Sequence, residues 1–150
     1  MQHSKTLDQL TESFEGCELK AYQDGGGVWT IGYGHTSGVT QGMTCTLSQA
    51  EHWLDSDYRT AENAVNFNVK PQLSQPEFDA LVDFVFNVGA KRFEESTMLT
   101  LINQSQFHLA ALEFDKWDLV KGQICAGILR RRQAETALFE EGVTDGNTSA

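Results

Sequence analysis

The chain has 150 residues, 40% of them hydrophobic and 21% charged, and only two are prolines. This balance predicts one globular domain, residues 1–150, and excludes a disordered or fibrous protein. The 21 acidic and 11 basic residues give a net charge of −10, which argues against nucleic acid as a partner. The opening residues, MQHSKTLDQL, hold neither the apolar region of a signal peptide nor a membrane span. We therefore expect a chain made in a cytoplasm, with no stable membrane insertion.

The first predicted element is a short helix that ends at Gly16, a residue suited to the C-cap. Its apolar residues recur at helical spacing: Leu7, Leu10 and Phe14. Thr6 and Gln9 have the spacing of a capping box at its start.

A β-hairpin is predicted next, within residues 19–35, where aromatic and β-branched residues flank the run DGGG that begins at Asp24. Such a run between two strand-like segments is typical of a hairpin with a loose turn.

Two longer helices are predicted after the hairpin, over residues 46–65 and 74–89. Each begins with a capping box: Thr46 with Gln49, and Ser74 with Glu77. The second is apolar nearly all round, which predicts a buried central helix. Shorter helices are predicted over 97–103, 106–117 and 124–140, followed by a frayed tail over about 143–150. The sequence therefore predicts a mainly helical α+β fold with one small hairpin sheet.

Three polar residues near the hairpin are candidates for catalysis: Glu15, Asp24 and Thr30. Glu15 falls in the last turn of the first helix, where the helix dipole disfavours a carboxylate by up to about 1 kcal/mol and so favours the protonated form of a general acid. Asp24, in an open glycine-rich turn, should stay ionised, and the hairpin can bring the Thr30 hydroxyl towards it to orient a water molecule. Two carboxyl groups in opposing environments are typical of acid and base roles. Taken alone, these residues fit a structural role as well, since acidic residues at helix ends and Asp-Gly turns are common.

Other reactive side chains favour structural interpretations. The cysteines lie at wide spacing without a C-x-x-C pair, so neither a disulfide framework nor a zinc site is predicted: Cys17, Cys45 and Cys125. Cys17 is interpreted as a small buried hydrophobe. The histidines are scattered, with no H-E-x-x-H arrangement, and a metal hydrolase is not expected: His3, His35, His52 and His108. The basic run from Arg130 to Arg132 is interpreted as a solvated helix face with one or two structural ion pairs.

The spacing of the candidate residues, within FEGCELKAYQDGGGVWTIGYGHT, resembles the catalytic segment of the phage-type lysozymes, the endolysin muramidases of tailed bacteriophages. The likeness continues in order through GVTQGMTCTLSQAEHWLDSD, FDALVDFVFNVG, FEESTMLTLIN, AALEFDKWDLVKG and GILRRRQAETALF. The resemblance implies two lobes bridged by a long helix, with a glycan cleft between them. It further implies lysis of the host cell by hydrolysis of the β-1,4 bond between N-acetylmuramic acid and N-acetylglucosamine in peptidoglycan.

By the same resemblance, Glu15 is the general acid, Asp24 positions or activates the attacking species, and Thr30 helps to hold the water. No cofactor and no metal are implied. The expected partner is the glycan strand of peptidoglycan, bound by a monomer that stays in the host cytoplasm until release and then acts on the cell wall in the periplasm. Aromatic residues that could stack on sugar rings, with burial in the core as the alternative, are Trp29, Tyr33 and Trp117. His35 is expected to be a structural hydrogen-bond partner.

Two other functions stay open from the sequence. A lytic transglycosylase would need only one acid/base glutamate, leaving Asp24 and Thr30 idle, and a noncatalytic wall-binding or tail-attached module would need none of the three residues.

The sequence also departs from many phage-type lysozymes, because its net charge is acidic and because residues 124–126 stand where relatives often carry proline. It does not distinguish a free endolysin from a tail component or a prophage product.

Overall fold

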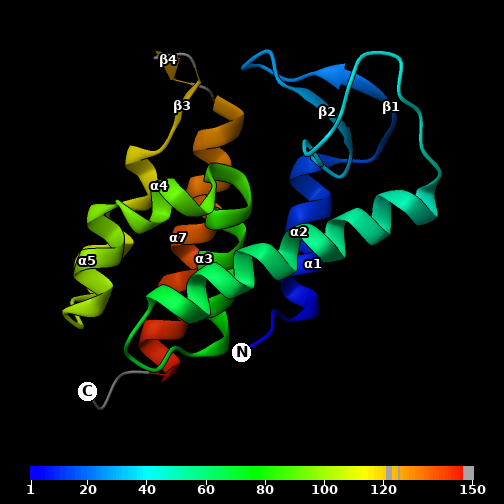
Figure 1. Ribbon diagram of the computed structural model, residues 1–150. Helices are drawn as coiled ribbons and strands as arrows, with labels where there is room; N and C mark the ends of the chain where they lie inside the picture. The colour runs from blue at the N-terminus through cyan, green and yellow to red at the C-terminus, as the bar shows by residue number, and fades with distance from the viewer. Residues whose placement is uncertain (121–122, 125, 147–150) are drawn as a thin grey trace.

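The computed structural model describes residues 1–120, 123–124 and 126–146, and it confirms a mainly helical α+β fold (Figure 1). The amino-terminal part consists of a helix and an antiparallel hairpin, followed by a long helix: α1 (Lys5–Glu15), β1 (Glu18–Gln23), β2 (Trp29–Gly32) and α2 (Leu47–Asn68). The rest forms a helical body with a second short hairpin: α3 (Gln75–Val88), α4 (Ala90–Glu94), α5 (Thr97–Asn103), α6 (Phe107–Ala111), the 3₁₀ helix η1 (Phe114–Lys116), β3 (Leu119–Val120), β4 (Gln123–Ile124) and α7 (Ala126–Gly146).

The helix α2 runs from the β1–β2 hairpin to the helical body and so joins two lobes (Figure 1). The capping boxes predicted for the starts of α2 and α3 are confirmed. The Gln49 amide donates to Thr46 Oγ1 at 3.1 Å, while the Thr46 amide donates to Gln49 Oε1 at 2.9 Å. Reciprocal bonds of the same kind join Ser74 and Glu77 at the start of α3. Because each pair satisfies two amides that a helix start leaves open, both helices begin where the sequence predicts.

The central helix of the body is α3, and its burial is confirmed. Phe78, Leu81 and Phe84 are fully buried in one continuous hydrophobic cluster that also includes residues of α5, α6 and α7. Figure 1 shows α7 passing alongside α3 through the body. Since α3 is covered on several sides, polar side chains that it carries are enclosed and need partners within the protein.

The start of α1 differs from the prediction. The N-cap is Ser4, not Thr6, and the Ser4 side chain makes no capping bond. Instead, the Ser4 amide donates to Asp79 Oδ1 of α3 at 3.0 Å, and the Ser4 hydroxyl donates to Asp79 Oδ2. The predicted capping box of Thr6 and Gln9 is therefore wrong, because a carboxylate from a distant helix fixes the start of α1.

The carboxy-terminal elements also differ from the prediction. The segment 106–117 forms two short helices, α6 and η1, and α7 starts at Ala126 and continues past Glu140 to Gly146. The extension is explained by packing, since Phe139 and Val143 are buried in the core cluster. Of the predicted tail, residues 147–150 lie outside the described residues, as does Cys125. None of the described helices combines the length and apolar composition that crossing a lipid bilayer requires.

Candidate active site

Glu15 is the last residue of α1, and two contacts with α3 hold this helix in place. The Thr11 hydroxyl, one turn before Glu15, donates to Asp83 Oδ1 at 2.9 Å, and Ser4 binds Asp79 at the other end of α1. Gly16 ends the helix with a φ of 61°. The Glu15 side chain is only 17% exposed. Its backbone position is therefore fixed by the helical body, although the hairpin follows directly in sequence.

The carboxyl group of Glu15 lies against Gly34, in the loop after β2. A Cβ atom on Gly34 would stand 2.6 Å from Glu15 Oε2 and 2.7 Å from Glu15 Cδ. The φ of Gly34 is 80°, a conformation that side chains rarely adopt. Glycine at this position thus gives the carboxyl group its room, a role that the sequence analysis missed. Its only signal is a glycine in the short segment GYGH.

The second neighbour of Glu15 is Arg131 of α7. Arg131 Nη1 donates to Glu15 Oε1, while Nε and Nη2 of the same guanidinium bind Asp83 at 3.0 and 2.9 Å. Arg131 and Arg132 are 3% and 0% exposed, and Arg130 alone of the three faces solvent. The prediction of structural ion pairs is confirmed, but the prediction of a solvated face is wrong for Arg131 and Arg132. Their acidic partners lie in the core, where the sequence pattern gave no indication of them.

The ion pairs continue into the helical body. Arg132 donates to Asn87 Oδ1, stacks over the Phe84 ring at 5.0 Å, and places Nη1 3.1 Å from Glu135 Oε1. Burial, together with the neighbouring Asp83 charge, raises the pKa of Glu135 well above its ordinary value. Burial also acts to raise the pKa of Asp83, but the Arg131 charge and several hydrogen bonds outweigh it, so that the pKa lies below its ordinary value. Asp83 is thus an ionised carboxylate with fixed partners.

Asp24 and Thr30 lie on one face of the β1–β2 hairpin. The ladder pairs Tyr22 with Thr30, and the Asp24 amide donates to the Val28 carbonyl at 2.9 Å. Asp24 Oδ1 accepts hydrogen bonds from the amides of Gly26 and Val28, each at 2.9 Å. The Thr30 hydroxyl donates to the Val28 carbonyl at 2.9 Å. Both side chains are therefore held by the turn itself, and the register makes them diagonal neighbours on the sheet.

The tyrosine beside this pair, Tyr22, connects it to Glu15. Burial first, and then the charges of Glu15, Glu18 and Asp24, raise the pKa of the Tyr22 hydroxyl. The carboxylates of Glu15 and Asp24, from the helix and from the turn, thus act on the same phenol. No sequence motif marks Tyr22, although its place two residues before Asp24 puts it on the same face of the strand.

Gly34, which lies against the Glu15 carboxyl group, also lines a hollow of about 380 Å³, although Glu15, Asp24 and Thr30 are not among its lining residues. Its walls come from the loop after β2, from the middle of α2 and from the end of α3 with the start of α4: Gly34, Thr36, Ser37, Ser56, Asp57, Thr60, Ala61, Val85, Phe86, Gly89 and Ala90. The lining thus includes hydroxyl groups and a carboxylate as well as apolar side chains and an aromatic ring. This combination suits a sugar, which presents hydroxyl groups at its rim and C–H groups on its faces.

Comparison with known proteins identifies the family. A family model described as phage lysozyme matches residues 12–135. The chain belongs to the phage lysozyme family. It is 40% identical over 135 residues to the endolysin of Acyrthosiphon pisum secondary endosymbiont phage 1, a match that covers 87% of this chain and 92% of that relative. As a member of the family, the chain is a peptidoglycan-hydrolysing endolysin, a muramidase among the glycoside hydrolases.

Two further matches agree with this membership. The endolysin of Bacillus phage PZA is 40% identical over 145 residues, which cover 95% of this chain and 56% of that longer relative. The solved structure of an endolysin from Escherichia coli O157:H7 phage FAHEc1 superposes with a TM-score of 0.81 at 35% identity, covering 93% of each chain. The resemblance and the fold expected from it are thus confirmed.

The aromatic candidates of this phage lysozyme lie in different surroundings. Trp29 is half-buried and pairs with Gln23 in the ladder, so it faces away from Thr30. Tyr33 packs against the core cluster, and Trp117 meets Phe84 edge-on with ring centroids 5.5 Å apart. The structure does not bring the three together. Their sugar-stacking role stays a prediction.

His35 makes the structural contacts expected of it. Its Nδ1 lies 2.8 Å from Asp57 Oδ2, and its ring stacks on Trp53 at a centroid distance of 4.7 Å. Cys17 and Cys45 are half-buried free thiols.

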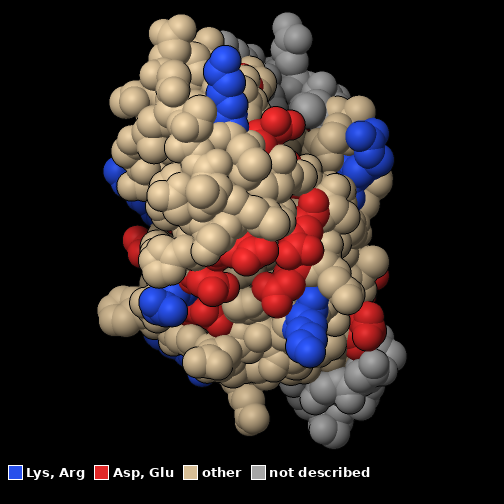
Figure 2. All heavy atoms as spheres, turned by 90° about the vertical axis from the view of Figure 1, so that its right-hand side faces the viewer, with Lys and Arg blue, Asp and Glu red and all other residues tan. Residues whose placement is uncertain are grey.

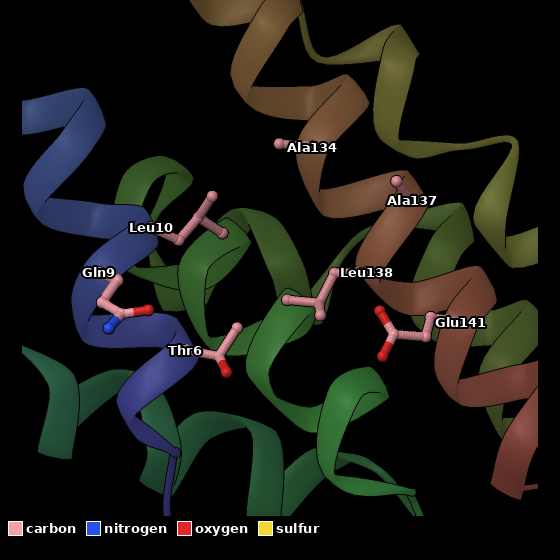
Figure 3. Close-up of a pocket in the computed structure, with 7 residues that line it drawn as sticks. All are labelled: Thr6, Gln9, Leu10, Ala134, Ala137, Leu138 and Glu141. Atoms are coloured by element: carbon pink, nitrogen blue, oxygen red, sulfur yellow. The ribbon is translucent and has the colours of Figure 1, made fainter.

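The larger hollow of this phage lysozyme is remote from the candidate residues. It is an open apolar groove of about 520 Å³ between α1 and α7, lined by Thr6, Gln9, Leu10, Ala134, Ala137, Leu138 and Glu141 (Figure 3). Glu15, Asp24 and Thr30 are absent from its lining. Size alone therefore does not locate the active site.

The acidic net charge is visible on the surface. Figure 2 shows one face on which Asp and Glu side chains gather in a central group, with Lys and Arg towards its margins. A polyanion approaching this face meets a field of like sign.

Proposed function

We propose that this phage lysozyme cleaves the β-1,4 bond between N-acetylmuramic acid and N-acetylglucosamine by inverting hydrolysis. Glu15 is the general acid that protonates the leaving oxygen, and Asp24 with Thr30 presents water to the opposite face of the sugar. The observation that carries the proposal is that the two carboxylates have different partners: Arg131 and Gly34 contact Glu15, whereas turn amides bind Asp24. Different surroundings suit the two carboxyl groups to different roles.

The hydrogen bonds of the hairpin support the role of the water. Because the Thr30 hydroxyl gives its proton to the Val28 carbonyl, its oxygen meets a water molecule as an acceptor. Both backbone amides that bind Asp24 use Oδ1, and no described residue hydrogen-bonds to Oδ2. A water that donates one proton to Thr30 and one to Asp24 Oδ2 keeps a lone pair for attack on the anomeric carbon. Asp24 takes up its proton as the bond forms.

The glycan is proposed to enter the hollow beside Gly34. Ser37, Thr60 and Asp57 supply hydrogen-bonding groups there, and Phe86 supplies an aromatic face. The enzyme acts as a monomer on glycan strands without nucleic acid, and it reaches the periplasm from the host cytoplasm after release. No step of this mechanism needs a cofactor.

The products of digestion test the reaction. Hydrolysis of purified peptidoglycan releases reducing-end muropeptides, whereas a lytic transglycosylase releases anhydro products that are lighter by one water. Mass spectrometry in H₂¹⁸O should therefore show hydrated products with one ¹⁸O at the new reducing end. Anhydro products without the label would assign the chain to transglycosylation and leave Asp24 and Thr30 without a role.

A further inference from the structure

Arg131 contacts two carboxylates at once, and they come from different helices. Its Nη1 binds Glu15 of α1, and its Nε and Nη2 bind the two oxygens of Asp83 of α3. The side chain of Asp83 is 0% exposed and that of Arg131 is 4% exposed. This geometry gives Asp83 the larger share of the guanidinium, with two hydrogen bonds against one.

The contact between Arg131 and Glu15 raises a chemical difficulty. A guanidinium beside a carboxyl group favours its ionised form, whereas a general acid must carry its proton when substrate binds. Asp83 resolves the conflict, because its negative charge offsets the positive charge of Arg131 within the core. Glu15 then meets a nearly neutral ion pair, which still donates a hydrogen bond.

The geometry points to Asp83 as a positioning residue of this reaction: by neutralising Arg131, it lets Arg131 orient Glu15 without locking Glu15 in its ionised form. The inference rests on the proposed function, in which Glu15 gives up a proton. Asp83 also receives the Thr11 hydroxyl at 2.9 Å, so the same carboxylate fixes the helix that carries Glu15. Asp83 therefore sets both the place and the charge environment of the acid without touching substrate.

Other titratable and charged groups surround this cluster and contribute to its field. They are Tyr22 and Glu18 of β1, Tyr58 of α2, and Arg132 and Glu135 of α7. Burial, followed by the Asp83 charge, raises the pKa of Glu135, so Glu135 offers Arg131 less compensation than Asp83 does. In the described part of the chain, Asp83 is the only residue whose side chain makes two hydrogen bonds to Arg131.

The test is the pH dependence of kcat/KM on purified peptidoglycan for Asp83→Asn and Arg131→Gln. Activity falls at high pH as the general acid loses its proton, which defines the basic limb of the profile. Asn keeps the shape of Asp83 but leaves Arg131 uncompensated, so the basic limb should move to lower pH by about one unit, at the low end of the roughly 1–3 units that a close charge produces. Arg131→Gln removes the cation, so the limb should move to higher pH.

Asp79→Asn is the matched control. Asp79 is a buried aspartate one turn before Asp83 on α3, and it holds α1 through Ser4 but does not contact Arg131. It should lower thermal stability and leave the basic limb in place. If the Asp83→Asn limb stays at the wild-type pH, or moves upward, the inference is wrong. Should Asp83→Asn not fold, Arg131→Gln decides the matter, and an unmoved limb there overturns the inference.

Glu15→Gln, measured in the same series, separates this inference from the proposed function. If folded Glu15→Gln keeps its activity, the proposed function fails whatever the Asp83 variant does. If Glu15→Gln is inactive but the Asp83→Asn limb does not move, only the role of Asp83 fails.

Discussion

Replacing Gly34 by alanine tests how closely the position of the Glu15 carboxyl group controls turnover. The new Cβ would lie 2.6 Å from Glu15 Oε2 and must reach at least 3.4 Å for ordinary van der Waals contact. The Glu15 carboxyl group must therefore withdraw by about 0.8 Å, given that carbon and oxygen repel steeply at shorter range. It cannot do so freely, because Arg131 holds Glu15 Oε1 and the side chain is only 17% exposed.

The expected loss follows from this displacement. A shift of about 1 Å in a reacting group can cost about 10²-fold in rate. We expect Gly34→Ala to lower kcat by that order on purified peptidoglycan. Alanine at a φ of 80° also costs folding free energy, about 1–2 kcal/mol, and this loss must be separated from the effect on Glu15.

Gly38→Ala provides the separation. Gly38 has a φ of 72°, and a Cβ there would meet nothing within 4 Å. Both variants carry the cost of a positive φ, and Gly34→Ala should lose somewhat more stability in thermal unfolding because of its contact with Glu15, but only Gly34→Ala should lose turnover. Equal kcat values for the two folded variants would refute the reasoning that Gly34 makes room for the acid.

Three further outcomes are expected. Gly142→Ala should destabilise the protein by roughly 1–3 kcal/mol in thermal unfolding, because the new Cβ would lie 2.8 Å from the Glu77 amide nitrogen and collide with Ser74 Oγ. This is the reverse of the stabilisation that alanine usually gives in place of glycine within a helix. Asp24→Asn and Thr30→Val should each lower kcat with little change in glycan binding. Their effects should be non-additive in a double-mutant cycle, because both residues act on one water molecule. Additive losses of kcat, or losses explained by weaker binding alone, would contradict this. The initial rate on soluble peptidoglycan fragments should rise between about 0.01 and 0.1 M sodium chloride, because the net charge of −10 repels an anionic substrate, and a steady fall would show that a local basic field dominates.

Local patterns explain which parts of the fold the sequence predicts. The capping boxes at Thr46 and Ser74 involve residues three positions apart, so their signal is complete within a short segment. The turn at Asp24 is likewise local, because the amides that it binds come from Gly26 and Val28. Where an element is fixed from afar, as Ser4 is by Asp79, the local pattern at the start of α1 misleads.

The same distinction between local and distant contacts applies to the candidate active site. The spacing of Glu15, Asp24 and Thr30 is readable in the sequence, whereas their supporting contacts are not. Arg131 reaches Glu15 across 116 positions of the chain, so a run of three arginines suggests solvent exposure when read alone. Gly34 touches the acid only after the hairpin has folded back. Non-local packing thus supplies the surroundings that the chemistry requires.

The most direct test of the central claim is Glu15→Gln, assayed for clearing of outer-membrane-permeabilised cells beside Glu12→Gln. The amide keeps the shape of Glu15 but cannot donate a proton as an acid, and general acid–base catalysis is worth about 10²–10⁴-fold. Glu12 lies on the same helix, one turn earlier and exposed to solvent, so its variant controls for the loss of a carboxylate from α1. We predict that Glu15→Gln folds as the wild type does but fails to clear the cells, while Glu12→Gln clears them normally. Clearing at the wild-type rate by folded Glu15→Gln would contradict the account.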